Sequence, residues 1–275
     1  MKFADLHTHT YFSDGKLSPE ELIDKALGRG LTTISISDHD TLGAYDYLQS
    51  NSITPKIDLI TGIELSGYEG TSEFHILGYN FDLNNNNLRE HTINMKKSRL
   101  IRAEKILLKL SSLGIKLEMD QLVTRVAEAA IGRPHIAELM FDKGYVTNLK
   151  DAYLHYIGDG CPAYVQKMYF SVRNAIELIN KSGGVAVLAH PANSTDQSTL
   201  YRFIKYGLDG IEVIHPSHTP YLQKYYHSIA SQYWLLETGG SDFHGIAEYE
   251  ESNFGKFVVP SSVVDSIRFR AKSHL

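Results

Sequence analysis

The sequence predicts an α/β fold with a largely parallel sheet. Short apolar runs of strand length alternate with amphipathic helical segments, an order typical of strand–helix–strand units. Most of these runs end in or near a histidine or a carboxylate, which indicates that polar side chains collect at one end of the sheet. The 275 residues allow one or two domains, and 43% apolar with 21% charged residues is ordinary globular composition.

Eight apolar runs have the length of strands: Lys2–Leu6, Thr32–Ser37, Ile57–Leu65, Glu73–Tyr79, Gly184–His190, Gly210–His215, Trp234–Thr238 and Lys256–Val259. Ser18 before Pro19 and two glutamates predicts the start of a helix, with an N-cap, a proline in the first turn and acidic side chains at the positive end. Gly30 suits the end of that helix. Ser171–Gly183 indicates another helix by the same signals.

The strand–helix alternation stops between Asn84 and Ala163. The Asn84–Asn87 run predicts a loop, and the apolar spacing that follows predicts a long amphipathic helix around Leu100–Leu110. Three further helices are expected over Glu118–Ala130, Arg133–Asp142 and Leu149–Tyr156. We therefore expect a helical insertion, or cap, over residues 84–163 and a sheet domain formed by residues 1–83 and 164–275.

Composition excludes several classes of protein. No apolar run approaches the ~18 residues that span a bilayer, and Met1–Asp5 lacks the apolar core of a secretory signal. Cys161 is the only cysteine, so no internal disulfide forms and a reducing, cytoplasmic location is expected. The net charge of −5 means that a polyanion needs a local basic or metal-rich site.

Histidines and carboxylates near the predicted strand ends carry the functional argument. His7 and His9 are two residues apart, so their side chains share one face of a strand. Asp14 follows in a Ser-Asp-Gly sequence, where a turn role is the alternative. His39 stands between two aspartates, which suits a metal ligand oriented by an acid, although an aspartate there also suits the N-cap of a helix that begins near Thr41. Glu64 closes the third run, where a lone buried carboxylate needs a partner or a metal.

The later runs repeat the pattern. His75 lies within the fourth run, where a core role is the alternative, and His190, His215 and the Asp242–His244 segment follow the fifth, sixth and seventh. In α/β barrels the carboxyl ends of the strands converge on one face, so these side chains predict a metal site there. The chain has no G-x-S-x-G elbow, no H-E-x-x-H helix motif and no phosphate-binding Walker loop to compete with this interpretation.

These motifs together resemble the polymerase and histidinol phosphatase (PHP) family. The similarity runs in order from Asp5-Leu6-His7-Thr8-His9 through Ser37-Asp38-His39-Asp40-Thr41, Gly62-Ile63-Glu64 and Ala189-His190-Pro191 to Gly240-Ser241-Asp242-Phe243-His244. The insertion and its Gly132-Arg133-Pro134-His135 are similar to the bacterial branch of small PHP phosphoesterases. That branch includes 3′,5′-nucleotide bisphosphate phosphatases and 5′-to-3′ exoribonucleases that act on short RNA.

The resemblance implies a distorted (β/α)7 barrel with a helical insertion and three divalent metal ions. Mn²⁺ is expected first, with Zn²⁺ or Fe²⁺ as alternatives, because mixed imidazole and carboxylate ligands do not select one metal. One ion would take His7, His9, Glu64 and Asp242, and a second would share Glu64 and add His75 and His190. The third would take Asp14, His39 and His244.

The expected activity is hydrolysis of a phosphate ester by a metal-activated hydroxide. Six neutral imidazoles and three carboxylates around three divalent ions leave about three positive charges, which would hold a polyanion on an acidic protein. The catalytic roles fall to Asp14, His39, Glu64 and His215. Arg133 is expected to clamp a phosphate, and His135 and His215 to contact the substrate, with buried structural or surface roles as the alternatives.

The expected substrate is a small phosphorylated nucleotide, most simply 3′-phosphoadenosine 5′-phosphate (pAp), cleaved to AMP and phosphate. Short RNA is the first alternative, and histidinol phosphate is another. A metal-dependent amidohydrolase is the nearest alternative outside the family. The alternative that is not an enzyme is a PHP-type domain with a structural or binding role. Lys96, Lys97, Arg99, Arg102, Lys105 and Lys109 give a basic helix face, which suits either solvent or a nucleic acid. No membrane and no obligatory protein partner is expected.

Overall fold

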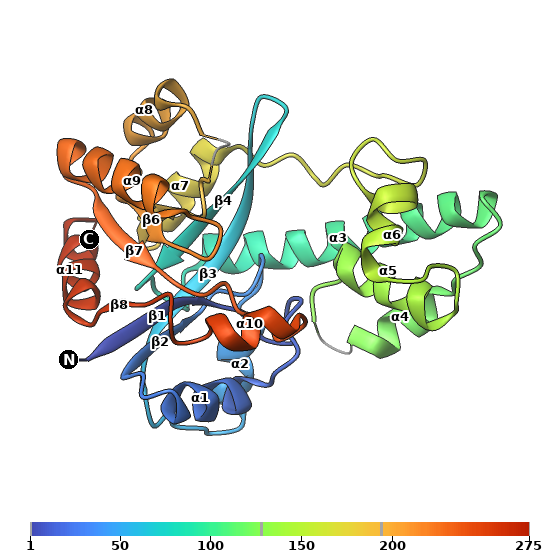
Figure 1. The fold of residues 1–275 in the computed structure, drawn as a ribbon, viewed down its shortest axis with the longest axis horizontal. Coiled ribbons are helices and arrows are strands. Elements are labelled where there is room, and N and C mark those ends of the chain that lie inside the picture. Colours follow the sequence, from blue (N-terminus) through green and yellow to red (C-terminus); the bar gives the residue numbers. More distant parts are fainter. Residues whose placement is uncertain (1, 127–128, 193–194, 275) are drawn as a thin grey trace.

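The computed structural model describes residues 2–126, 129–192 and 195–274. It has two visibly separate parts, a barrel-shaped sheet surrounded by helices and a helical part that extends to one side (Figure 1). The strands are β1 (Phe3–Thr8), β2 (Thr33–Ile36), β3 (Asp58–Glu69), β4 (Ser72–Tyr79), β5 (Val185–Leu188), β6 (Gly210–Ile214), β7 (Leu236–Gly239) and β8 (Val259–Pro260). They pair in the order β7-β6-β5-β4-β3-β2-β1-β8.

The sheet contains two parallel groups with an antiparallel strand between them. β1, β2 and β3 are parallel, as are β5, β6 and β7, whereas β4 is antiparallel to both of its neighbours. Only Gly70 and Thr71 connect β3 to β4, and Gly70 has a φ of +62°. So short a connection permits a hairpin and leaves no room for the crossover that parallel strands need. The predicted α/β barrel is confirmed, with this reversal inside it.

β1 closes the barrel because two different segments share its second edge. β8 pairs antiparallel with Phe3 and Ala4 at the start of β1. Near the end of β1, the segment that follows β7 pairs with this edge instead, through a parallel bridge between Thr8 and Phe243. A Cβ at Gly240 would lie 2.4 Å from the backbone nitrogen of His7, so only glycine lets this segment approach β1.

Helices cover the outside of the barrel: α1 (Pro19–Gly28), α2 (Gly43–Ser50), α7 (Val172–Lys181), α8 (Gln197–Lys205), α9 (Pro220–Tyr233), α10 (Glu248–Asn253) and α11 (Ser262–Ala271), with a 3-10 turn at Lys272–His274. α1 begins as predicted, with a capping box in which Ser18 and Glu21 satisfy each other's backbone nitrogens. Its buried face, Leu22, Ile23 and Ala26, packs into the main apolar cluster of the barrel.

The helical part consists of α3 (Asn86–Ser112), α4 (Met119–Val126), α5 (Arg133–Asp142), α6 (Leu149–Ala152) and a π-helical turn (Tyr153–Ile157). The predicted loop at Asn84–Asn87 is partly wrong, because Asn85 caps α3 by accepting from the backbone of Asn87 and Leu88 and the helix starts at Asn86. The predicted helix Glu118–Ala130 includes residues 127–128, which lie outside the described residues.

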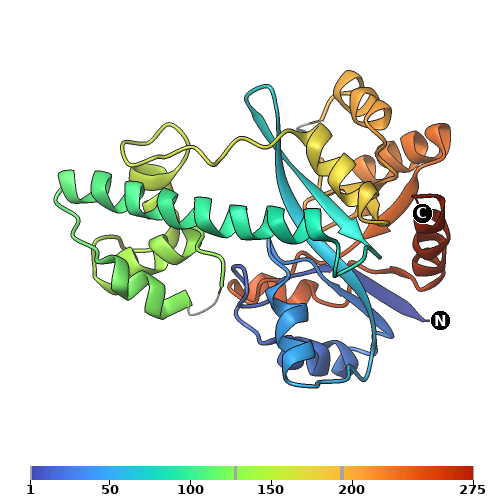
Figure 2. The ribbon, with the colours of Figure 1, turned by 180° about the vertical axis from the view of Figure 1, so that it is seen from behind.

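α3 starts beside the barrel and runs outward to the far end of the helical part (Figure 2). The helical part has an apolar cluster of its own, centred on Ile106, Leu110, Leu122, Ile136 and Met140. The domain limits of 84–163 stay a prediction. None of the described helices is long and apolar enough to cross a membrane.

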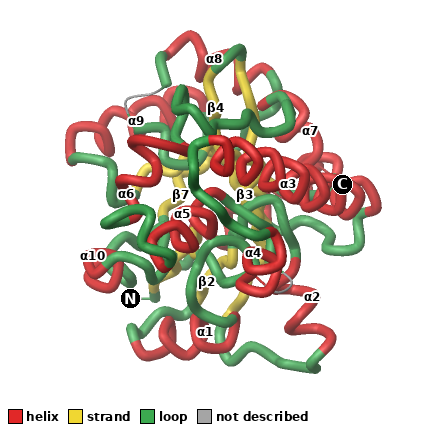
Figure 3. The backbone as a smooth tube through the Cα atoms, turned by 90° about the vertical axis from the view of Figure 1, so that its right-hand side faces the viewer, coloured by secondary structure: helices red, strands yellow, loops and turns green. Residues whose placement is uncertain are grey.

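The helical part faces one end of the barrel. Figure 3 shows the molecule from the side of the helical part, and α4 and α5 lie in front of the strands. Among the contacts that join the parts, two lie at the strand ends. Arg99 of α3 forms an ion pair with Asp40, which follows β2, and the backbone nitrogen of Ala130 donates to the carbonyl of Phe12 at 2.9 Å. Both contacts involve loops that follow parallel strands, so the helical part covers the carboxyl end of the barrel, where the predicted site residues stand.

Candidate metal centre

Imidazole and carboxylate side chains gather at this end of the barrel. His7 is the penultimate residue of β1, and His9 follows that strand directly. A parallel backbone bridge joins His39, after β2, to Glu64 in the middle of β3. His190 follows β5 and Asp242 follows β7 by a few residues. Residues far apart in sequence therefore meet at one point, as the strand-end pattern predicts.

Three of the residues in these loops have a backbone conformation that side chains other than glycine rarely adopt. The φ angles are +55° at Asp40, +27° at His190 and +51° at Asp242. Hydrogen bonds from the backbone nitrogen hold all three in place, and that of Asp40 donates to the carbonyl of Glu64 at 3.0 Å. The backbone nitrogen of His190 donates to Glu212 at 2.8 Å, and that of Asp242 donates to the carbonyl of His7 at 2.8 Å. Such local strain is typical of functional loops.

Glu64 is the hub of the cluster. Its carboxylate is fully buried and has five imidazoles around it. One oxygen, Oε1, lies 2.8 Å from Nδ1 of His75 and 3.0 Å from Nε2 of His190. The other oxygen, Oε2, lies 3.1–3.3 Å from His39 Nδ1, His7 Nε2 and His9 Nε2. A single carboxylate between two groups of imidazoles has the geometry of a bridging metal ligand.

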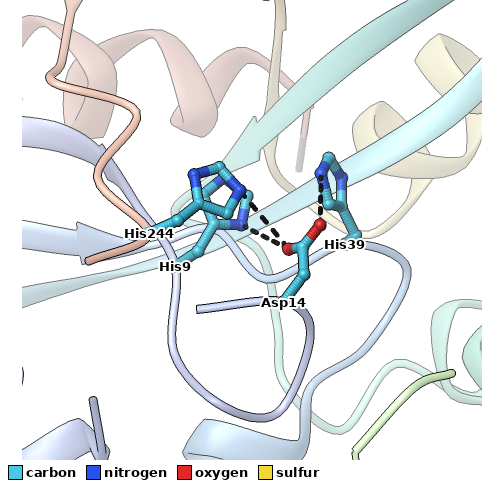
Figure 4. A group of neighbouring side chains, drawn as sticks. All are labelled: His9, Asp14, His39 and His244. Carbon is cyan, nitrogen blue, oxygen red and sulfur yellow. Dashed lines mark ion pairs between the residues drawn. The ribbon is translucent and has the colours of Figure 1, made fainter. Parts of the chain in front are cut away.

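Two aspartates complete the cluster. Asp242 Oδ1 lies 3.1 Å from Nε2 of His9 and 3.3 Å from Nε2 of His7. Asp14 lies among three imidazoles, with contacts of 3.4 Å to His244, 3.9 Å to His39 and 4.0 Å to His9, as Figure 4 shows. Asp14 lies in the loop after β1, and the turn predicted there directs its carboxylate toward these imidazoles.

The nitrogen and oxygen atoms of this cluster are better placed to bind metal ions than to form hydrogen bonds with one another. His9 Nε2, His39 Nδ1, His75 Nδ1 and Asp14 Oδ1 are buried without a hydrogen-bond partner among the described residues, which is costly unless something else binds them. Among the described residues, four groups of possible ligand atoms each lie within 4.8 Å of one another, and one of them joins His7 to Glu212 and His215. The other three consist of predicted ligands: His9, Asp14, His39 and His244; His7, His9, Glu64 and Asp242; and His39, Glu64 and His75. We call the nine predicted residues, these eight and His190, the metal centre.

The carboxylates of the metal centre stay ionised. Burial by itself raises the pKa of Glu64, but the neighbouring imidazoles outweigh it and hold that pKa well below its usual range. The same balance lowers the pKa values of Asp14 and Asp242. Three ionised carboxylates in one buried place need compensating cations, which divalent ions would supply.

The aspartates on either side of His39 do not orient its ring, so that expectation is wrong. Asp38 accepts from the backbone of Thr10 and from the hydroxyls of Thr10 and Ser13, and so fixes the loop that carries Asp14. Asp40 accepts from the backbone of Ser66 and pairs with Arg99. The side chains of consecutive residues point in different directions, and the tertiary partners of each acid decide its role.

Glu212 is a buried residue of the centre that the sequence analysis missed. It is fully buried on β6, and its Oε1 lies 3.0 Å from Nδ1 of His7. The His7 nitrogen that faces Glu64 and Asp242 is therefore Nε2, so Glu212 fixes the direction in which His7 presents its lone pair. Its other oxygen accepts from the backbone of His190. The only sequence signal was a glutamate inside an apolar run, three residues before His215.

A model of the PHP domain matches residues 5–236. The chain belongs to the PHP family. The match ends before Asp242 and His244, yet the geometry brings both into the same centre as the residues within it.

Two curated PHP relatives cover nearly the whole chain. A 5′-3′ exoribonuclease of Haemophilus influenzae is 33% identical over 249 residues, which is 88% of this chain and 90% of that protein. A 3′,5′-nucleoside bisphosphate phosphatase of Chromobacterium violaceum is 30% identical over 254 residues, covering 90% and 89%. A structure from Bifidobacterium adolescentis, described as a metal-dependent phosphoesterase, aligns with a TM-score of 0.89 at 29% identity over 97% of this chain and 96% of that one. The protein is therefore a metal-dependent phosphoesterase of the PHP family.

His215 adjoins the metal centre of this PHP domain. Its Nε2 lies 3.4 Å from Oδ2 of Asp242, and its ring centroid lies 5.3 Å from that of His190. Its Nδ1 is 2.7 Å from the hydroxyl of Ser217. The predicted position of His215 beside the other site residues agrees with the structure, and its role stays a prediction.

Four cations line the junction between the PHP barrel and the helical part, and we call Arg99, Arg102, Arg133 and Lys167 the cation cluster. Lys167 lies 3.1 Å from the hydroxyl of Ser66 and pairs with Glu73, so it adjoins β3 and β4. Burial, followed by repulsion from Arg133 and Arg99, lowers the pKa of Arg102 to about 10. Burial and then Arg99 likewise lower the pKa of Lys167. An anion bound among these cations would relieve their mutual repulsion.

The two predicted substrate contacts on α5 have partners of their own. Arg133 pairs with Asp159 at 2.5 Å, and its guanidinium lies 5.8 Å from the rings of Tyr153 and Tyr164. His135 accepts from the backbone of Gly132 at 3.0 Å through Nδ1, which caps the start of α5. That leaves Nε2 as the only His135 nitrogen able to reach a substrate. Both roles stay predictions.

Proposed function

We propose that this PHP phosphoesterase hydrolyses the 3′ phosphate ester of nucleotides that also carry a 5′ phosphate, and that pAp is its simplest substrate. The observation that carries the proposal is the pairing of two anion-binding features at one end of the barrel. The metal centre suits the phosphoryl group that reacts, and the cation cluster beside it suits a second phosphate.

Three divalent ions, with Mn²⁺ as the first choice, would occupy the metal centre. His7, His9, Glu64 and Asp242 would hold the first ion, Glu64, His75 and His190 the second, and Asp14, His39 and His244 the third. The 2.8–3.3 Å contacts on both oxygens of Glu64 support a bridging role. When bound, such ions supply an activated water and bind phosphoryl oxygens.

The chain's own residues would position the substrate. Arg99 is buried at the junction of the two parts, paired with Asp40, and its Nε has no partner among the described residues. Arg99, Lys167 and Arg133 would bind the 5′ phosphate, since planar guanidinium groups match phosphate oxygens. His215, 3.4 Å from Asp242, would contact the reacting phosphoryl group. His135 would contact the substrate only through Nε2.

The reaction consumes one water. The hydroxide oxygen bonds to the phosphorus of the 3′ phosphoryl group, the bond between phosphorus and O3′ breaks, and O3′ takes a proton. From pAp the products are AMP and inorganic phosphate. The buried carboxylates and the covering helices would keep other nucleophiles from the phosphorus.

A 5′-to-3′ exoribonuclease is the second candidate, because short RNA with a 5′ phosphate presents the same bond. Hydrolysis between phosphorus and the first O3′ then releases the first residue as a 5′ mononucleotide and leaves a 5′ phosphate on the shortened RNA. The 33% identity to a curated exoribonuclease supports this candidate as strongly as the 30% identity to a bisphosphate phosphatase supports the first.

Phosphate release from pAp with Mn²⁺, with identification of the nucleotide formed, tests the proposal. Formation of AMP is the expected result, and formation of 3′-AMP would reject the assignment of the 3′ ester. Histidinol phosphate serves as the comparison substrate, and faster hydrolysis of it than of pAp would assign the enzyme to the histidinol branch. Cleavage of an amide substrate, with no reaction on any phosphoester, would favour the amidohydrolase alternative.

A further inference from the structure

A pocket of about 470 Å³ opens directly beside the metal centre. It reaches the centre through Asp242 and His244, and its other walls include His215, Ser217, Tyr249 and Asn253. None of the functions assigned so far uses Tyr249 or Asn253. The pocket is large enough for a nucleoside, since small-molecule sites begin at about 300 Å³.

This pocket and the cation cluster lie on opposite sides of the metal centre. The pocket is lined by the segments that follow β6 and β7, whereas Arg99 and Lys167 contact Asp40 after β2, Ser66 on β3 and Glu73 on β4. In the order of the sheet, β6 and β7 are separated from β3 by β4 and β5 on one side and by β1 and β2 on the other. A substrate held by the cation cluster therefore crosses the metal centre before it reaches the pocket.

The pocket walls are chemically unlike the cation cluster. Its lining contains no lysine or arginine, and its charged members are the carboxylates of Asp242 and Glu250. Glu250 accepts from the backbone nitrogens of His244 and Ile246. A second phosphate would be repelled there, whereas a neutral ribose and base would find an aromatic ring, a hydroxyl and an amide.

Tyr249 lies on the short helix α10, which is anchored to the barrel by contacts at its end and along its length. The ring is 66% exposed. Phe254, just beyond α10, is buried against Phe243, with ring centroids 4.7 Å apart. On the other side of α10, Arg29 donates to the carbonyl of Glu251 at 2.9 Å. A large exposed aromatic on an anchored support, beside a phosphoryl-binding centre, is the arrangement that stacks a nucleobase.

We propose that this pocket, hereafter the nucleoside pocket, binds the second nucleoside of a phosphodiester substrate, the one joined through its O5′ to the reacting phosphoryl group. The inference rests on the proposed function and deepens it, because it assigns a binding site to the nucleoside that distinguishes a phosphodiester from pAp. In the dinucleotide pApA the 5′ phosphate lies on the cation cluster, the internal phosphate lies at the metal centre, and the second adenosine enters the pocket. Hydroxide bonds to that phosphorus, the bond to the first O3′ breaks, O3′ takes a proton, and two AMP molecules form.

The test compares pAp with pApA, which differ only in the second nucleoside, on the wild-type enzyme and on Tyr249→Ala with Mn²⁺. Loss of the stacking ring should raise the KM for pApA about fivefold or more, while both kinetic constants for pAp stay within about twofold of wild type. Tyr249→Phe keeps the ring and should restore the KM for pApA. Tyr221→Ala removes an exposed tyrosine of α9 that does not line the pocket. This variant should leave the kinetic constants for both substrates unchanged.

Two outcomes would overturn the nucleoside pocket and leave the proposed function standing. One is rapid hydrolysis of pAp with none of pApA. The other is hydrolysis of both with the same KM for pApA in Tyr249→Ala as in wild type. Failure of the wild-type enzyme on pAp, with normal metal content, would instead reject the proposed function itself.

Discussion

The metal centre and the cation cluster both have a proposed role in holding phosphate, but they are built differently. The metal centre comes from strand ends and the loops after them, and its central carboxylate has contacts of 2.8–3.3 Å to five buried or half-buried imidazoles. The cation cluster comes from α3, α5 and the segment before α7. Arg99, Arg133 and Lys167 each pair with an acid on the barrel or the helical part, whereas Arg102 donates to the carbonyl of Val165. In the proposed function, the barrel therefore supplies the chemistry and the helical part selects the phosphorylated molecule.

The strongest test of this division is Glu64→Gln. The amide keeps the volume of the side chain but lacks the charge that would bridge two ions, so turnover of pAp should fall about 10³-fold and the content of bound metal should drop. Metal analysis and steady-state kinetics measure both. Glu69→Gln, on the same strand and paired with Arg202 at the surface, is the control and should keep full activity. Normal metal content and turnover in Glu64→Gln would break the assignment of Glu64 as the hub.

Asp14→Ala should have the next largest effect. It removes the carboxylate that lies between His9, His39 and His244, so one ion should be lost and turnover should fall by about 10²-fold. Counting bound metal per chain together with kcat distinguishes this result from misfolding. Asp24→Ala, on the exposed face of α1, is the matched aspartate. Wild-type kinetics with a full metal complement would contradict a third ion.

Glu212→Gln tests whether the centre depends on its outer partners. Without the carboxylate that faces His7 Nδ1, affinity for Mn²⁺ should weaken about 10- to 100-fold, and saturating metal should restore much of the activity. Metal titration followed by calorimetry gives the affinity directly. The surface pair of Glu237 with His227 has the same two residue types, so Glu237→Gln should leave metal affinity unchanged. Equal metal affinity in Glu212→Gln and wild type would contradict the proposal that Glu212 orients His7.

Arg133→Ala sharpens the comparison from the side of the helical part. The KM for pAp should rise about tenfold, because a charged hydrogen bond to the 5′ phosphate is lost, while the KM for 3′-AMP should change little. Arg125→Ala serves as the control, because it removes an arginine of α4 whose acid partners among the described residues are Glu138 and Asp142. An equal rise in KM for both substrates would mean that Arg133 supports the fold of the helical part instead of binding the second phosphate.

A metal site at this end of the barrel was predictable because most of its residues stand near the end of an apolar run, whereas the places of Asp14 and His75 in it came from the resemblance to the PHP family. His7 and His9 share a strand face, and parallel strands bring their carboxyl ends together, so a local pattern was enough to expect that His39, Glu64 and His190 would meet them. The capping box of α1 was predictable for the same reason, since all of its atoms lie within four residues.

Other features depend on partners distant in sequence, and only the tertiary structure decided them. Glu212 resembles an ordinary strand glutamate until the closed barrel brings β6 and β1 to the same interior and places it 3.0 Å from His7, 205 residues away. Asp38 and Asp40 look equivalent around His39, but the loop after β1 engages one and α3 engages the other. The pocket beside Asp242 exists because the segment after β7 joins β1 and α10 folds back beside it. Chain periodicity specifies which face a side chain takes, whereas its partner depends on which segments the packed barrel brings together.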